Sequence, residues 1–133
     1  MKCIYCQSPT NIVNSRRKTN NETWRRHRCT NCQSVFTTIE AADLDTSLTV
    51  RSKTNNVQPF SRDRLFVSVL RSVGHRPRAL GEASDLTRTI IVELLKANAG
   101  NALLTDYIIS TTKTVLSNFD NAAAVQYAAY HQI

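Results

Sequence analysis

Hydrophobic positions recur at two different spacings along this chain, and the change falls close to residue 46. Before it, short runs rich in strand-forming residues alternate with polar ones, at Ile12–Asn14, Thr23–Arg28 and Gln33–Glu40. β-Branched and aromatic residues in short runs of this kind favour strands. The first forty residues are therefore predicted to form three short antiparallel strands.

From residue 47 onward, the pattern predicts one hairpin followed by helices. Ser47–Lys53 alternates as a strand, Thr54–Asn56 is typical of a tight turn, and Val57 begins a return strand that Pro59 ends. Apolar residues at helical spacing then predict four helices. We expect them at about 62–73, at about 81–98, from Thr105 as N-cap through at least Leu116, and at about 120–130. The predicted fold class is α+β, with a domain 1–40, a linker 41–46 and a domain 47–133 whose hairpin packs on a helical bundle.

All four cysteines of the chain lie in its first domain, as two Cys-x-x-Cys pairs. Two such pairs facing each other form a tetrahedral sulfur site, which Zn²⁺ prefers over other common ions. The predicted ligands of one zinc ion per chain are Cys3, Cys6, Cys29 and Cys32. Two disulfides or an iron–sulfur cluster are the alternative uses of four cysteines. Four thiolates leave zinc no open position, so the predicted metal is structural.

The positive charge of the chain is concentrated on the same domain. The net charge is +7, and residues 1–40 carry seven Lys or Arg against two Glu. Such a balance points to a polyanionic partner, most often nucleic acid, although a solvated basic surface is the alternative. The candidate DNA-binding residues are Arg16, Arg17, Arg25, Arg26 and Arg28.

The densest basic run, Trp24–Arg28, is predicted to lie on a strand. Alternation places Arg26 and Arg28 on one face with Trp24, and Arg25 on the other face with His27. Trp24 either belongs to a nucleic-acid surface or covers the small core of the domain. His27 is a further possible zinc ligand, in place of a cysteine.

The sequence also indicates a compartment. No apolar run approaches the roughly 20 residues that span a bilayer, and the N-terminus leads directly into a cysteine pair, with no room for a signal peptide. We therefore expect a soluble protein in a reducing, intracellular compartment, the cytoplasm, with no membrane partner.

Several local motifs follow one another in a familiar order. Their ordered set is Met-Lys-Cys-x-x-Cys, Asn14-Ser15-Arg16, an arginine-rich run before Cys29-x-x-Cys32, Phe36-Thr37-Thr38-x-Glu40, a strand with Val50, Pro59-Phe60, and Ser-Arg-Asp-Arg-Leu from residue 61. This set resembles the NrdR family, the bacterial transcriptional repressors of ribonucleotide reductase genes. The resemblance implies a zinc ribbon that binds double-stranded operator DNA, followed by an ATP-cone. It also implies that ATP or dATP in the cone sets the form of a homo-oligomer, and thereby DNA binding.

The resemblance also implies which residues contact the nucleotide. The family strand Val-x-Lys-Arg-Asp-Gly is represented by residues 50–55, in which only Val50 and Lys53 align directly, and Gln58 replaces an acidic residue. The implied nucleotide-binding residues are Val50, Arg51, Lys53, Gln58, Arg64, Tyr127 and Tyr130.

Two other classes of function compete with a nucleotide-responsive repressor. A zinc-dependent enzyme such as a nucleotide hydrolase is disfavoured, because four thiolates close the metal site and the sequence carries no Walker loop or nucleophile motif. The alternative is a zinc-ribbon interaction module whose vestigial cone binds no nucleotide. We therefore expect a non-enzymatic repressor.

Overall fold

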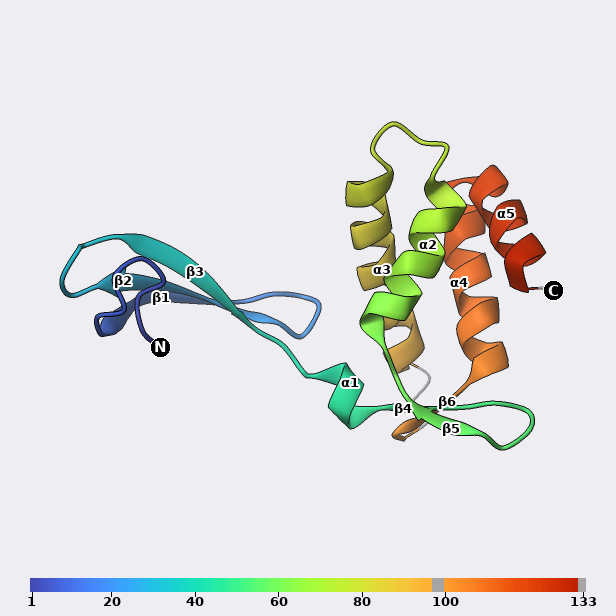
Figure 1. Cartoon of the computed structure of the whole chain (residues 1–133), viewed down its shortest axis with the longest axis horizontal. Helices are drawn as coiled ribbons and strands as arrows, with labels where there is room; N and C mark the ends of the chain where they lie inside the picture. The colour runs from blue at the N-terminus through green and yellow to red at the C-terminus, as the bar shows by residue number, and fades with distance from the viewer. Residues whose placement is uncertain (97–99, 132–133) are drawn as a thin grey trace. The chain divides into compact units, whose positions relative to one another are not determined.

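The computed structural model describes residues 1–96 and 100–131, and the chain separates into two compact units. The first unit is Met1–Ala42 and the second begins at Asp43 (Figure 1). An α+β fold is confirmed, with an antiparallel sheet in the first unit and helices with a second small sheet in the other. No helix within the described ranges is both long and apolar enough to cross a membrane.

Three antiparallel strands make up the first unit. They are β1 (Thr10–Arg17), β2 (Thr23–Cys29) and β3 (Val35–Glu40), in the order β1-β2-β3. The predicted strands are present, but β1 extends beyond residues 12–14 at both ends. Its register with β2 shifts between Ile12 and Asn14, which leaves Val13 as an extra residue at an irregularity.

The first unit has a very small core. Cys3, Cys29 and Phe36 are buried together, and the buried ring of His27 stacks on Phe36 at 5.2 Å between centroids. Trp24 is 36% exposed and does not belong to this cluster. The interpretation that Trp24 covers the small core of this unit is therefore wrong.

The second unit opens with a helical turn, α1 (Leu44–Ser47), where the sequence predicts a linker and the start of a strand. The side chain of Asp45 accepts a hydrogen bond from the backbone N–H of Arg62 at 3.2 Å, which fastens this turn to the next helix. A contact between residues this far apart in the sequence does not affect local hydrophobic periodicity. The predicted linker and strand start at 44–47 are therefore wrong, and these residues form a helical turn.

A second sheet follows, in the order β5-β4-β6. The predicted hairpin is present as β4 (Thr49–Arg51) and β5 (Val57–Pro59), with Asn55 in the left-handed conformation at φ 64°. The first strand is shorter than predicted, and β5 ends at Pro59 as predicted. The strand β6 (Ala102–Leu104), parallel to β4, was not predicted, because three residues are too few for a periodic signal.

Four helices complete the unit: α2 (Arg62–Val73), α3 (Ala79–Lys96), α4 (Thr105–Phe119) and α5 (Asn121–His131). Ser61 caps α2 by accepting a hydrogen bond from the N–H of Arg64. The helix α3 begins two residues before its predicted start, and its predicted end at residue 98 lies outside the described residues. The prediction that Thr105 caps α4 is wrong, since Leu104 is the N-cap and the Thr105 hydroxyl donates to the carbonyl of Arg51.

The core of the second unit lies among these four helices, which stand together over the small sheet (Figure 1). Every helix contributes fully or almost fully buried side chains to it, among them Val69, Ile90, Leu116 and Tyr127. The hydrophobic stripes predicted for α2, α3 and α4 thus face one another.

A charged network joins the two connections at one end of the bundle. Arg76, between α2 and α3, donates to Glu82 at 2.5 Å and to Asp120, between α4 and α5, at 3.1 Å. His75 also pairs with Asp120 at 2.9 Å. The hydrogen bond from His75, followed by that from Arg76, lowers the pKa of Asp120 to about 2.

We expect Asp120→Asn to lower the melting temperature at pH 7. The substitution preserves an oxygen that can accept from the N–H of Ala122, but removes the charge that Arg76 binds. Because the folded pKa lies below the ordinary value of 3.8, the carboxylate stabilises the fold above pH 4 and loses this effect as the pH falls through about 2.

The difference between variant and wild type should therefore shrink below pH 4 and disappear as the pH falls through about 2, as measured by circular dichroism at each pH. Asp85→Asn, the same charge change at an exposed position of α3, is the control. A difference that stays constant from pH 7 to pH 2 would contradict the electrostatic explanation.

Candidate functional site

The four cysteine sulfurs gather at one end of the first sheet. Their Sγ atoms all lie within 4.8 Å of one another. The separation is 3.7 Å between Cys3 and Cys32, and 3.4 Å between Cys6 and Cys29. A tetrahedral zinc ion with bonds of about 2.3 Å separates its sulfurs by about 3.8 Å. The site therefore fits one Zn²⁺, and the four cysteines are free thiols, not disulfides.

Both cysteine pairs are built in the same way. Each is followed by a glutamine in the left-handed conformation, Gln7 at φ 62° and Gln33 at φ 63°. In each knuckle the first cysteine sulfur accepts a backbone N–H, from Tyr5 at 3.4 Å and from Asn31 at 3.3 Å. Hydrogen bonds of this kind orient metal ligands and stabilise their anionic form.

The sulfurs differ in acidity because their surroundings differ. Hydrogen bonds from Ser8 lower the pKa of Cys6 to about 5, and those from Ser34 lower the pKa of Cys32. Burial raises the pKa of the Cys29 thiol to about 11. A bound metal ion would deprotonate all four thiols, so the site is suited to a closed structural metal centre.

His27 is not one of the metal-binding residues. Its Nε2 lies 2.9 Å from the hydroxyl of Thr38 and its Nδ1 lies 3.3 Å from that of Thr10. Both ring nitrogens are thus used inside the sheet, and the hypothesis that His27 replaces a cysteine is wrong.

The arginines predicted to bind DNA are divided between the two faces of the sheet. Residues directly opposite in the register lie on the same face, and Trp24 is opposite Arg16. Alternation along β2 adds Arg26 and Arg28, and all three arginines are exposed. We call these four residues the basic face.

The remaining two predicted arginines lie on the opposite face. Arg17 is opposite Thr23, and Arg25 forms an ion pair with Glu40 of β3. Lys18, which was not predicted as a site residue, places its Nζ 4.5 Å from the centre of the Trp24 ring. A single flat partner would thus meet three of the five predicted arginines.

The residues predicted to bind a nucleotide differ in their burial and in their partners. Val50 is half-buried against the core, Arg51 is exposed, and Lys53 pairs with Asp106 at 3.2 Å. Gln58 accepts a hydrogen bond from Arg64 at 3.0 Å, which joins β5 to α2.

The two predicted tyrosines have opposite environments. Tyr127 is 2% exposed and packs inside the core, with its ring 4.2 Å from that of His131. Tyr130 is 60% exposed. Their three-residue spacing on α5 places one inward and the other at the surface.

A hollow of about 470 Å³ between α2 and α5 brings together Arg64 and Tyr130. We call it the α2–α5 pocket. Sequence reasoning missed its other lining residues, since α2 and α5 meet only in the folded unit. They are Asp63, Val67, Ser68, Arg71 and His131. Two arginines beside an exposed aromatic ring suit a ligand that carries phosphate and a flat base.

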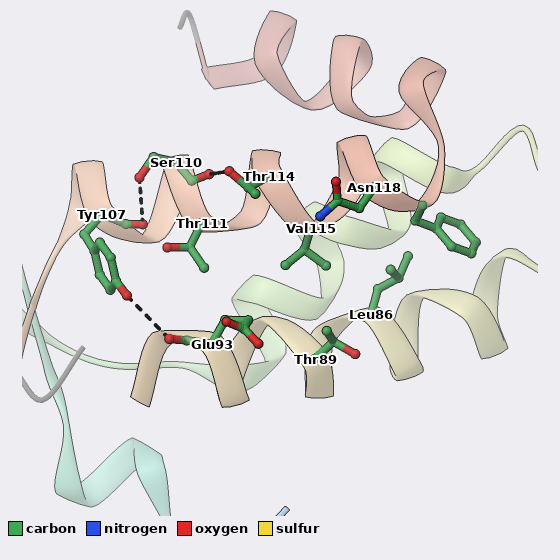
Figure 2. A pocket seen from close by; sticks show the side chains of 10 residues that line it. Leu86, Thr89, Glu93, Tyr107, Ser110, Thr111, Thr114, Val115 and Asn118 are labelled. Carbon is green, nitrogen blue, oxygen red and sulfur yellow. Dashed lines mark hydrogen bonds between the residues drawn. The ribbon is translucent and has the colours of Figure 1, made fainter. Parts of the chain in front are cut away.

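A second hollow, of about 630 Å³, lies between α3 and α4 and is shown in Figure 2. Its lining includes the hydroxyls of Thr89, Ser110, Thr111 and Thr114, with Tyr107 near one end. Among the lining residues that the structure describes, none is Lys or Arg. The α2–α5 pocket is therefore the better candidate for a phosphate-bearing ligand.

Replacing Cys29 with alanine should abolish zinc binding and unfold the first unit, because three ligands and one buried aromatic ring leave almost no core. Metal content after dialysis measures the first effect, and near-UV circular dichroism of Trp24 measures the second. The helical signal of the second unit should persist. Ser15→Ala, on an exposed part of β1, is the control, and a Cys29→Ala protein with one bound zinc would contradict the assignment.

Comparison with known proteins bears on both units. Residues 1–40 match the family model for the N-terminal domain of transcriptional repressor NrdR-like proteins, a zinc ribbon. The chain is 29% identical over 134 residues to the transcriptional repressor NrdR of Streptococcus sanguinis, covering 99% of this chain and 84% of the relative. It is 28% identical over 137 residues to the protein of that name from Roseiflexus castenholzii, covering 99% and 87%. The zinc-ribbon match and these relatives together support the NrdR family for this chain, as the order of its motifs predicts.

Proposed function

We propose that this protein is a zinc-dependent transcriptional repressor that binds operator DNA of ribonucleotide reductase genes under the control of ATP and dATP. One observation carries the DNA-binding part. Arg16, Arg26 and Arg28 lie on one face with Trp24 and form no ion pair within the described part of the chain. Free arginines on a rigid sheet are suited to phosphates and to base edges.

Zinc supplies the rigidity of this face. It would be held by the four cysteines, and β2, which carries two of the arginines, ends at one of them, Cys29. The metal adds no catalytic chemistry in this proposal. The protein is a regulator that acts by binding, in the cytoplasm and at the nucleoid.

A single ribbon provides few DNA contacts. Useful affinity requires two or more ribbons on one duplex, because linked binding events gain a high effective concentration. In the proposal, residues 1–40 bind DNA, 41–46 form the linker, and 47–133 form an ATP-cone that senses nucleotide and holds the homo-oligomer together. Nucleotides would alter DNA binding by favouring assemblies that space the ribbons differently.

The α2–α5 pocket is the proposed nucleotide site. Arg64 and Arg71 would face the phosphates, and Tyr130 would stack on the base. The hairpin would contribute Lys53 and Arg51, which do not line the pocket itself. ATP and dATP differ by one hydroxyl, so they can act differently only if each favours a different assembly.

An interaction module with a cone that binds no nucleotide is the second candidate. It is favoured by the contacts of Lys53 and Arg64, each of which already has a partner in Asp106 or Gln58. Calorimetry with ATP separates the two candidates.

Arg28→Ala should weaken operator binding and lower the slope of log affinity against log salt by about one, because one phosphate contact is lost. Fluorescence anisotropy with duplex DNA at several salt concentrations measures both quantities. Arg17→Ala removes the same charge from the opposite face and is the matched control. Equal losses in the two variants would contradict the assignment to one face.

Arg64→Ala and Tyr130→Ala should each weaken ATP binding by roughly tenfold or more, since each removes a charge-assisted hydrogen bond or a stacking surface. Isothermal titration calorimetry on the full chain measures this. Thr111→Ala, in the hydroxyl-lined hollow between α3 and α4, is the control and should bind ATP as wild type does. Absence of wild-type binding at millimolar ATP would favour the interaction module.

A further inference from the structure

The hairpin cation that the proposed function directs to the phosphates has a negatively charged partner, and neither residue is among those that line the α2–α5 pocket. Asp106, in the first turn of α4, places a carboxylate oxygen 3.2 Å from the Nζ of Lys53. Lys53 is the cation at the tip of the hairpin that is expected to contact phosphate. Its partner is a carboxylate, which offers the same kind of oxygen acceptor as a phosphate group.

The backbone keeps these two residues close to each other. The strands β4 and β6 are parallel neighbours, with Arg51 opposite Leu104, and α4 begins immediately after β6. The hydroxyl of Thr105 also donates to the carbonyl of Arg51 at 3.3 Å. The hairpin and the start of α4 are thus linked two residues before Lys53 and one residue before Asp106, so Lys53 stays within reach of Asp106.

We infer that Asp106 is a built-in counter-ion that competes with the phosphates of the nucleotide for Lys53. This inference rests on the proposed function of the second unit. Nucleotide binding would break the Lys53–Asp106 contact and form a Lys53–phosphate contact. The measured affinity therefore reflects only the difference in free energy between these two contacts. The carboxylate thereby weakens binding and sets the nucleotide concentration to which the repressor responds.

The size of the effect follows from the exposure of the pair. The side chain of Lys53 is 82% exposed and that of Asp106 is 60% exposed, so solvent screens their attraction. Exposed ion pairs contribute modestly to stability. Removing the competitor should therefore tighten ATP binding by about two- to fivefold, without any change in the contacts to the base.

The same calorimetric titration of ATP tests the inference on the full chain. Asp106→Asn is expected to bind ATP two- to fivefold more tightly than wild type. Asp85→Asn makes the same change of charge at an exposed position of α3 that lines neither hollow, and should bind like wild type. Circular dichroism confirms that each variant is folded.

A double-mutant cycle separates competition for Lys53 from general repulsion of phosphate. In a Lys53→Met background, Asp106→Asn should give little or no gain, because the cation that both anions share is gone. An equal gain in both backgrounds would overturn the inference in favour of simple repulsion. Unchanged or weaker binding by Asp106→Asn would also overturn it, while leaving nucleotide binding itself intact. If neither wild type nor Asp106→Asn binds ATP, the proposed function is contradicted, and the inference that rests on it is contradicted as well.

Discussion

The first unit depends on its tetrahedral set of thiolates, because its other buried groups are too few to hold a fold. Phe36 and the His27 stacked on it are the large side chains covered in its small core. A sheet of three short strands with so little buried surface cannot offset the conformational entropy lost on folding. Zinc bound by four thiolates supplies that free energy, so metal binding and folding of this unit are one process.

The same constraint leaves one face of the sheet available for recognition. Since the metal site stabilises the end of the sheet, the face that carries Trp24 does not have to pack against a core. Arg16, Arg26 and Arg28 can then remain exposed on a fixed frame, where their guanidinium groups lose little entropy on meeting a phosphate. Arg25, in contrast, is held by Glu40, and its charge is largely satisfied within the sheet.

The second unit is stabilised by ordinary hydrophobic burial, and its polar contacts serve position more than stability. Arg76 and Asp120 fix one end of the bundle, while Thr105 and Asp106 fix the hairpin at the other. Between these ends, α2 and α5 leave a hollow that two arginines and Tyr130 line. Both helices pack into the same core, which fixes the shape of this hollow.

Local sequence determined much of this protein. The spacing of the cysteines specified the metal site, alternation specified the strands, and helical periodicity specified α2 to within a residue, because each signal arises from neighbours within a few positions. The composition of residues 1–40 likewise predicted that the first unit carries an excess of positive charge.

Tertiary structure alone decided which of these residues act together. Pairing in register assigned Arg17 to the face away from Trp24, and parallel pairing with β4 created β6 from three residues that show no pattern. Packing of α2 on α5 brought Arg71 and Ser68 to Tyr130, and the junction of β6 with α4 brought Asp106 to Lys53. Apart from the pairing of β1 with β2, these contacts join residues about fifty or more positions apart, and no local pattern records them.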